Sequence, residues 1–283
     1  MRPRCRGLTA ALALAAAFGA GPAAAQEAPA AQAAHAAEAE PEPGYGKRLW
    51  VDLKELAARP AHLDRRDWRN LGVAALAIGG TMALDEEIRD LFQRNRSESG
   101  DGAAETLRPL GHRVGPALLL GGLWAAGAIW DSPTLTAIGK DGVEASLFSV
   151  VLITPALKKL VGRARPDEEL GSTTFDPFSE FQSFPSGEAT QAFTIAAVVA
   201  AHTENPWVEG TAWGLAGLIG LERLYLDRHW ASDVVAGALI GAGVGSWVAK
   251  RHLNRPNGEG ATAWVVLPMV GRETYGIVGS VSF

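Results

Sequence analysis

The chain has 283 residues and a net charge of −5, with 47% hydrophobic and 20% charged residues. Its basic residues are not gathered on one polar stripe, so no nucleic-acid-binding module fits the sequence. The single cysteine, Cys5, excludes a disulfide within the chain.

Residues 1–25 have the three parts of a secretory signal peptide. A basic start, Met-Arg-Pro-Arg-Cys-Arg, precedes a short apolar run, and Gly-Pro-Ala-Ala-Ala follows as an Ala-x-Ala-type cleavage site. We expect cleavage after Ala25 and export of the rest of the chain.

Residues 26–46 consist mainly of Ala, Glu, Pro and Gln and cannot bury a core, so we expect a disordered linker. In the run 47–70, Leu49, Trp50, Leu53 and Leu56 recur at helical spacing. Charged residues fill the opposite face, which predicts one amphipathic helix packed against the protein body or lying on a membrane surface.

Six apolar segments follow and predict one all-α domain over residues 47–260, a helical bundle of about six helices. Glycines are expected where these helices touch, in the first segment (Gly72, Gly79, Gly80) and the last (Gly237, Gly241, Gly243, Gly245). The segments are 71–84, 114–130, 143–161, 188–202, 211–226 and 231–249.

The bundle is expected to be membrane-embedded. A span needs roughly 20 apolar residues, and the segments 114–130 and 231–249 are long, poor in charge and bordered by tryptophan. The first segment, with fourteen residues, is too short to cross easily. Lys250 and Arg251 follow the last segment and favour a cytoplasmic end there, which places the loop 223–233 in the periplasm.

The tail, residues 261–283, alternates apolar and polar residues around a central Gly-Arg-Glu. This pattern predicts a short β-hairpin appended to the helical domain.

His229 and Asp233 lie between two apolar segments, where ionisable side chains are costly. If a helix begins at Trp230, the Asp233 carboxylate lies one turn from the imidazole and accepts its ring N–H, which leaves the other nitrogen free to attack. A buried pair with no catalytic role is the alternative.

Two upstream clusters favour the catalytic interpretation. Lys158 ends an apolar segment and Arg165 follows seven residues later before a proline, although a cationic helix end would have the same pattern. Ser186 and Gly187 precede an apolar helical run, so they predict an anion-binding helix N-terminus. With Arg223, these groups describe a phosphate pocket that contains a nucleophile.

The spacings Lys158-x6-Arg165-Pro166, Pro185-Ser186-Gly187 and Arg223-x5-His229-x3-Asp233 resemble the three-part signature of the type 2 phosphatidic acid phosphatase and vanadium haloperoxidase superfamily. The resemblance covers about seventy-five residues. It implies a core of about six helices and metal-free phosphate hydrolysis through a phosphohistidine. It makes His229 the nucleophile, Asp233 its orienting partner, and the remaining residues phosphate ligands: Lys158, Arg165, Ser186, Gly187 and Arg223.

Two positions depart from that signature. Glu188 stands where the family has a histidine that protonates the leaving oxygen, and Glu222 stands where it has a serine. Glu188 either serves as this catalytic acid, with its pKa raised by a bound phosphate, or only caps its helix.

The sequence therefore predicts a phosphatase in the bacterial inner membrane, with a periplasmic site and no cofactor or metal, acting on a phosphate ester or pyrophosphate of an envelope lipid. Three alternatives remain open: a soluble periplasmic acid phosphatase, a catalytically impaired lipid-phosphate-binding protein, and a vanadate-dependent haloperoxidase.

Overall fold

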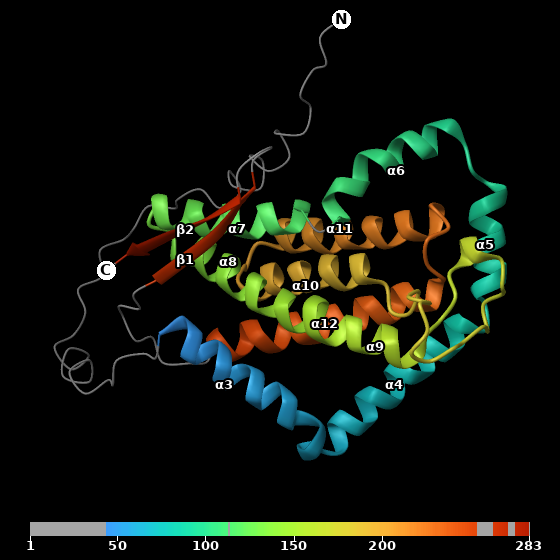
Figure 1. The fold of residues 1–283 in the computed structure, drawn as a ribbon, viewed down its shortest axis with the longest axis horizontal. Coiled ribbons are helices and arrows are strands. Elements are labelled where there is room, and N and C mark those ends of the chain that lie inside the picture. The colour runs from blue at the N-terminus through green and yellow to red at the C-terminus, as the bar shows by residue number, and fades with distance from the viewer. Residues whose placement is uncertain (1–43, 113, 254–262, 271–274, 283) are drawn as a thin grey trace, which may run out of the picture. The chain divides into compact units, whose positions relative to one another are not determined.

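The computed structural model describes residues 44–112, 114–253, 263–270 and 275–282 (Figure 1). These residues fall into two compact units. The first holds the described residues from Asp64 to Leu253, and the second holds residues 44–63 with the described part of the tail. The predicted signal peptide, and the predicted linker up to residue 43, lie outside the described residues.

The second unit contains α3 (Tyr45–Ala58), the short 3-10 helix η2 (Arg59–His62) and two strands, β1 (Ala263–Val270) and β2 (Tyr275–Ser282). α3 begins inside the predicted linker. The strands pair antiparallel, with Ala263 opposite Ser282 and Val270 opposite Tyr275. Residues 271–274 lie outside the description, so a complete hairpin stays a prediction.

The single helix expected over 47–70 is wrong, because α3 ends at Ala58 and α4 (Arg65–Met82) begins seven residues later. Pro60 has no N–H to continue the hydrogen bonding of α3, and Leu63 is extended, with φ of −68° and ψ of 127°. Asp64 then starts α4 with a capping box: its side chain accepts from Asp67 N at 2.7 Å, and Asp67 Oδ2 accepts from Asp64 N.

The first unit is all-helical. Its described residues contain α4 and the helices α5 (Asp85–Arg94), α6 (Glu98–Gly111), α7 (Val114–Ile129), α8 (Pro133–Ser146), α9 (Thr154–Val161), α10 (Gly187–Ala201), α11 (Pro206–Tyr225) and α12 (Ala231–Leu253). A π-helical segment, η3 (Leu147–Ile153), joins α8 to α9, and a 3-10 turn, η4 (Pro166–Glu168), follows. With α8, η3 and α9 counted as one rod, residues 44–253 as described hold nine helices, not about six.

All six apolar segments lie in helices, as expected, but α5 and α6 were not foreseen. α5 is strongly polar and α6 contains few apolar residues, so neither helix has the long apolar run that predicted the others. The π-helical segment lies just before Pro155, which has no N–H to donate; the wider turn also lets Thr154 Oγ1 donate to Ser149 O.

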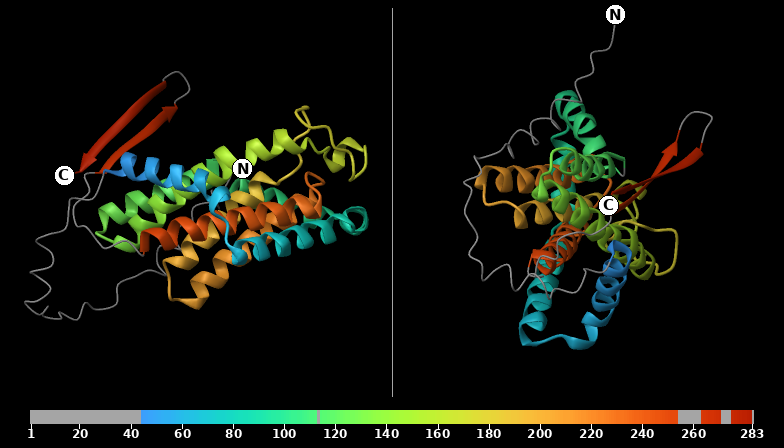
Figure 2. Two further views of the ribbon diagram at one scale, coloured as in Figure 1. Left: turned by 90° about the horizontal axis from the view of Figure 1, so that it is seen from below. Right: turned by 90° about the vertical axis from the view of Figure 1, so that its left-hand side faces the viewer.

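α10 lies at the centre of the first unit and packs against α8, α11 and α12 (Figure 2). Gly237, Gly241 and Gly245 form one stripe of α12 against the α10 backbone. A Cβ at these positions would lie 2.5 Å from Ser186 O, 2.3 Å from Thr190 O and 2.6 Å from Thr194 O. The prediction of close contact is confirmed for these three glycines. It is wrong for Gly72, Gly79, Gly80 and Gly243, which face open space.

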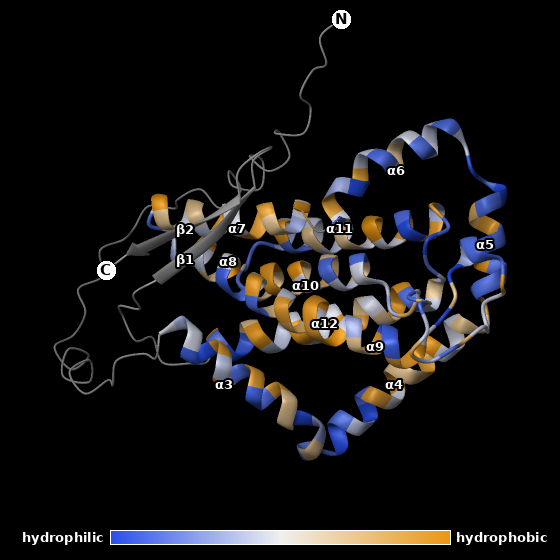
Figure 3. Cartoon of the chain, viewed as in Figure 1, coloured by the Kyte–Doolittle hydropathy of each residue, from blue (hydrophilic) through white to orange (hydrophobic). Residues whose placement is uncertain are grey.

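α12 is the one helix in the described residues that is long and apolar enough to cross a membrane, and half of its most apolar window is buried. α7 is apolar but shorter. Apolar residues run along α7, α11 and α12, whereas polar residues gather on α5 and the loop between α9 and α10 (Figure 3).

Candidate active site

The predicted site residues come from three places that meet at one end of α10 and α12: the end of α9, the start of α10 and the connection from α11 to α12 (Figure 1). Gly162 ends α9 in the left-handed conformation, with φ of 56°. A Cβ there would lie 1.7 Å from Asp176 O, so only glycine lets the loop 162–186 fold back over the helix end.

Ser186 is the N-cap of α10, as expected. Its hydroxyl accepts from Ala189 N at 3.4 Å, and its own N–H donates to Asp233 O at 3.0 Å. These bonds fix the start of α10 against the start of α12. Gly187 is not crowded, because an added Cβ would lie 3.8 Å from Thr154 Cγ2. Within the described residues, no neighbouring group therefore requires a glycine at position 187.

His229 is 3% exposed, and its two ring nitrogens face different carboxylates. Nε2 lies 3.4 Å from Glu188 Oε2. Nδ1 lies 3.7 Å from Asp233 Oδ2 and makes no hydrogen bond within the described residues. The expected hydrogen bond between the two side chains is therefore absent, although the carboxylate is close enough to stabilise a charged imidazole.

Asp233 is fully buried and already accepts three hydrogen bonds. Its Oδ2 accepts from Ser183 Oγ at 2.6 Å and from Trp230 N at 3.0 Å, and its Oδ1 accepts from Arg163 Nη1 at 2.7 Å. These bonds hold the carboxylate at the first turn of α12 and explain why it does not approach His229 more closely.

Arg163 is a buried residue that the sequence analysis did not single out. Its guanidinium pairs with Asp85 of α5 and with Asp233, each at 2.7 Å, and also donates to Ser172 O and Ser232 Oγ. Asp85 lies 148 residues before Asp233 in the sequence, so no local pattern could have connected them. Arg163 positions the partner of His229.

Lys158 and Arg165 supply positive charge at the end of α9. Lys158 is half-buried and its Nζ donates to Gln182 O. Burial, and then the charge of Arg165, lower the pKa of Lys158 to about 8, although Glu188 and Asp233 oppose the shift. No ion pair of the Arg165 guanidinium is found within the described residues, whereas its backbone N–H donates to Glu168 Oε2 at 2.6 Å.

Arg223 lies in the last turn of α11 and is paired with two carboxylates. Its Nε and Nη2 donate to Glu222, which is also buried, and its Nη1 donates to Glu188 Oε1 at 3.4 Å. Glu188 thus lies between Arg223 and His229 Nε2.

The Glu188 side chain is 29% exposed. Burial by itself would raise the pKa of this carboxyl, but the hydrogen bond and charge of His229 and the charge of Arg223 outweigh it. Together they hold the pKa of Glu188 well below its usual range, so the group is ionised when the pocket contains no phosphate.

A model of the PAP2 superfamily matches residues 143–256, a segment that contains all eight predicted site residues. We call residues 143–256, which resemble this superfamily, the PAP2 segment. Asp85, which holds Arg163, comes from outside this PAP2 segment.

Relatives of the PAP2 segment include named phosphatases. A lipid A 1-phosphatase of Rhizobium johnstonii is 35% identical over 106 residues, which cover 34% of this chain and 41% of that protein. A decaprenylphosphoryl-5-phosphoribose phosphatase of Mycobacterium tuberculosis is 34% identical over 104 residues, covering 37% and 56%. This chain therefore spans about two fifths of the first relative and somewhat over half of the second. The crystal structure of Aquifex aeolicus LpxE shares 28% identity with a TM-score of 0.49, over 59% of this chain and 95% of that one.

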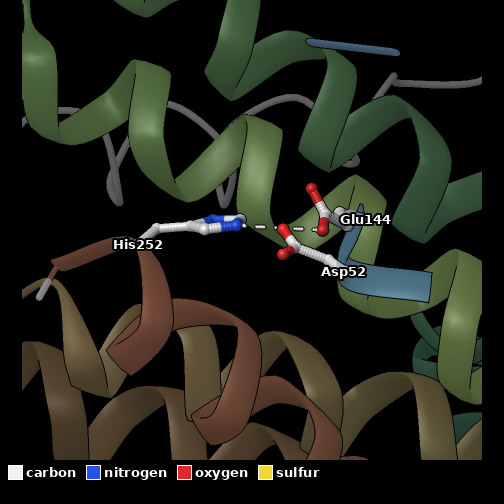
Figure 4. A group of neighbouring side chains, drawn as sticks. All are labelled: Asp52, Glu144 and His252. Atoms are coloured by element: carbon white, nitrogen blue, oxygen red, sulfur yellow. Dashed lines mark ion pairs between the residues drawn. The ribbon is translucent and has the colours of Figure 1, made fainter. Parts of the chain in front are cut away.

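The opposite end of α10 and α12 holds two further histidines, His202 and His252, which lie outside the motifs described above. Both lie at helix ends, but both side chains are buried. His202 Nε2 lies 2.8 Å from Asp141 Oδ2, and His252 Nδ1 lies 2.6 Å from Asp141 Oδ1. His252 Nε2 also faces Glu144 Oε1 at 3.8 Å (Figure 4). Asp141 is 61 and 111 residues from these histidines, so sequence spacing gave no signal.

Proposed function

We propose that the chain is a metal-independent phosphatase that hydrolyses a phosphate ester or pyrophosphate of an envelope lipid through a phosphohistidine on His229. The observation that carries this proposal is the position of His229 Nε2, which lies 3.4 Å from Glu188 Oε2 at the start of α10, while Glu188 Oε1 lies 3.4 Å from Arg223 Nη1. The names of the relatives add support for a lipid phosphate as substrate.

In the proposed mechanism, the lone pair of His229 Nε2 attacks phosphorus while the bond from phosphorus to the leaving oxygen breaks. Lys158, Arg165, Arg223 and the N-terminus of α10 stabilise the charge that develops on the phosphoryl oxygens. Asp233 stabilises the positive imidazole across 3.7 Å. Water then attacks the phosphohistidine, releases inorganic phosphate and returns the lone pair to Nε2.

The role of Glu188 divides into two testable cases. Ser186 already supplies the α10 cap, which weakens the case for Glu188 as a cap alone. An acid role requires Glu188 to gain a proton when phosphate binds, because its carboxyl is ionised beforehand. If it is the acid, Glu188→Gln slows esters with poor leaving groups far more than activated aryl phosphates. Equal slowing of both substrates would contradict the acid role.

The apolar side chains exposed on the helical unit support a membrane setting. Leu76 of α4, Leu118 of α7 and Trp207 of α11 are 77%, 71% and 84% exposed. Water-soluble proteins rarely expose large apolar areas of this kind without a partner. If α12 crosses the inner membrane, its basic C-terminal end is expected in the cytoplasm and the site at its other end in the periplasm.

Purified protein assayed against a panel of lipid phosphates and pyrophosphates tests the proposal. We expect phosphate release from at least one lipid, and a fall of at least about a thousandfold in His229→Ala, since the nucleophile is lost. His202→Ala is the matched control and should keep turnover per folded molecule. Wild-type release in His229→Ala would contradict the mechanism, and recovery of the protein in a detergent-free extract would favour the soluble phosphatase.

One observation favours a second candidate, a lipid-phosphate-binding protein without turnover: an ionised Glu188 stands beside His229 Nε2, where the family pattern has histidine. Under this alternative, the wild type binds lipid phosphates without releasing phosphate, and Glu188→His gains activity. A working enzyme would instead change mainly in its pH profile.

A further inference from the structure

The two departures from the family pattern, Glu188 and Glu222, meet on the same arginine. Arg223 has a flat guanidinium with two edges able to bind an anion. Glu222 accepts from Nε and Nη2 and so fills one edge, while Glu188 accepts from Nη1. A phosphate that reaches Arg223 therefore meets a cation already paired with two carboxylates.

The charges that face Glu188 come from every neighbouring segment. Arg223 approaches from α11, His229 from the connection to α12, and Lys158 from α9. Asp233 at the start of α12 shares the single cation Arg163 with Asp85 of α5, so these three groups add one negative charge. The backbone of Gly111 packs beside the Glu188 side chain from α6 without adding charge.

The charge of the pocket is consequently low. Lys158, Arg165 and Arg223 carry three positive charges, and Glu188 and Glu222 carry two negative charges. These five groups sum to one positive charge, which the surplus negative charge of Asp85 and Asp233 over Arg163 offsets. A phosphate dianion therefore adds more uncompensated negative charge to this partly buried site than a monoanion does.

We propose that Glu188 and Glu222 set the ionisation state of the phosphate group that the pocket accepts, so that it selects the monoanion over the dianion. This inference rests on the proposed function and defines its substrate class as a phosphate group that retains one proton. Glu222 acts through Arg223 and is a positioning residue, while Glu188 also borders the reacting nitrogen.

Proton binding to phosphate gives the selection a measurable signature. Inorganic phosphate, the probe used below, loses its second proton near neutral pH, about one unit above a phosphate ester, so the share of dianion grows as the pH rises from 5.5 to 7.5. Lys158, with a pKa of about 8, loses only a minor share of its protons over this interval. A pocket that selects the monoanion loses affinity as the pH rises, and a pocket with one carboxylate fewer loses less.

Calorimetric titration of the purified full chain with inorganic phosphate, at constant ionic strength and at pH 5.5 and 7.5, tests the inference without requiring turnover. For the wild type we expect binding at least about threefold weaker at pH 7.5. Glu188→Gln and Glu222→Gln should weaken this decline and bind phosphate at pH 7.5 at least about tenfold more tightly than the wild type. Glu180→Gln, which removes an exposed carboxylate paired with Lys159, is the matched control and should behave as the wild type.

A wild-type pH dependence that persists undiminished in Glu188→Gln would overturn the inference. Glu222→Gln alters a buried pair, and thermal denaturation will show whether this variant folds. If it does not fold, Glu188→Gln alone decides the question. The proposed function fails separately: the expected binding pattern without hydrolysis of any lipid would contradict the enzyme and support the charge selection. If the wild type hydrolyses a lipid phosphate, but the wild type and the variants bind inorganic phosphate with the same pH dependence, only the charge selection is contradicted.

Discussion

A cluster of histidine and aspartate lies at each end of α10 and α12, and the two clusters differ in the distance between the histidine and carboxylate groups. At the end away from the PAP2 motifs, Asp141 contacts His202 and His252 at 2.8 and 2.6 Å. At the candidate active site, His229 lies 3.7 Å from Asp233 and 3.4 Å from Glu188. Both contacts are longer than a strong charge-assisted hydrogen bond.

This difference separates a structural histidine from a reactive one. At the first end, the carboxylate is used to join three helices. At the second, Arg163, Ser183 and Trp230 satisfy Asp233, so the carboxylate is fixed without closing on His229. His229 is held by its burial, and its Nε2 faces the pocket. The predictions below test whether each end has the role that its contacts suggest.

The largest effect on stability is expected from Arg163→Ala. The change leaves Asp85 and Asp233 buried without their cation, which costs about 3–5 kcal/mol of unfolding free energy. Arg165→Ala is the control: it should keep the melting temperature and weaken phosphate binding at least about tenfold. Denaturant unfolding of both variants measures the first effect and calorimetry the second. Equal stability of the two variants would contradict the positioning role of Arg163.

Substitution at the opposite end should affect stability and leave chemistry unchanged. We expect His252→Ala to cost about 1–3 kcal/mol, because Asp141 loses a buried hydrogen-bond partner. Turnover corrected for the folded fraction should match the wild type. A specific loss of turnover in the folded His252→Ala protein would show that the comparison of the two ends is wrong.

The contact between α10 and α12 that joins the two ends is tested by Gly241→Ala. The new methyl group would lie 2.3 Å from Thr190 O and force the helices apart, at a cost of about 1–3 kcal/mol. Gly243→Ala in the same helix faces open space and should be neutral or stabilise by up to about 1 kcal/mol. Thermal denaturation compares the two, and equal melting temperatures would argue against this tight contact.

The smallest expected effect is a change in the alkaline limb of the pH profile. Lys158 loses its proton as the pH rises through about 8, so the pocket loses a cation and kcat/KM declines above that pH. Lys158→Arg retains its charge and should move the decline to higher pH, even if its maximum rate is lower. The same alkaline limb in both proteins would exclude Lys158 as its source.

Two local features of the site could be predicted from the sequence: Ser186 is the N-cap of α10, and His229 lies near Asp233, one helical turn away. The catalytic and phosphate-binding roles of the site residues stay a prediction. The apolar segments likewise predicted helices without knowledge of how they pack. Those inferences depend on backbone periodicity, which does not change with tertiary contacts.

Side-chain pairing between distant segments was beyond reach of the same reasoning. Arg163 was not singled out because it lies off the motif spacing, and its burial depends on Asp85 from a helix that was not foreseen. The prediction of a hydrogen bond from His229 to Asp233 was wrong for the same reason, because distant residues donate to the carboxylate instead. The contact of Glu188 with Arg223 joins two positions that the sequence presented as separate departures.

The central claim, that His229 Nε2 accepts the phosphoryl group, is tested most directly by trapping the intermediate. Wild-type protein is mixed with a ³²P-labelled lipid phosphate, quenched in base and digested, since a phosphohistidine survives base and is lost in acid. We predict an acid-labile label on the peptide that contains His229, which is absent from His229→Ala and present in His252→Ala. Hydrolysis by the wild type without any such label, or an equal label in His229→Ala, would contradict the account.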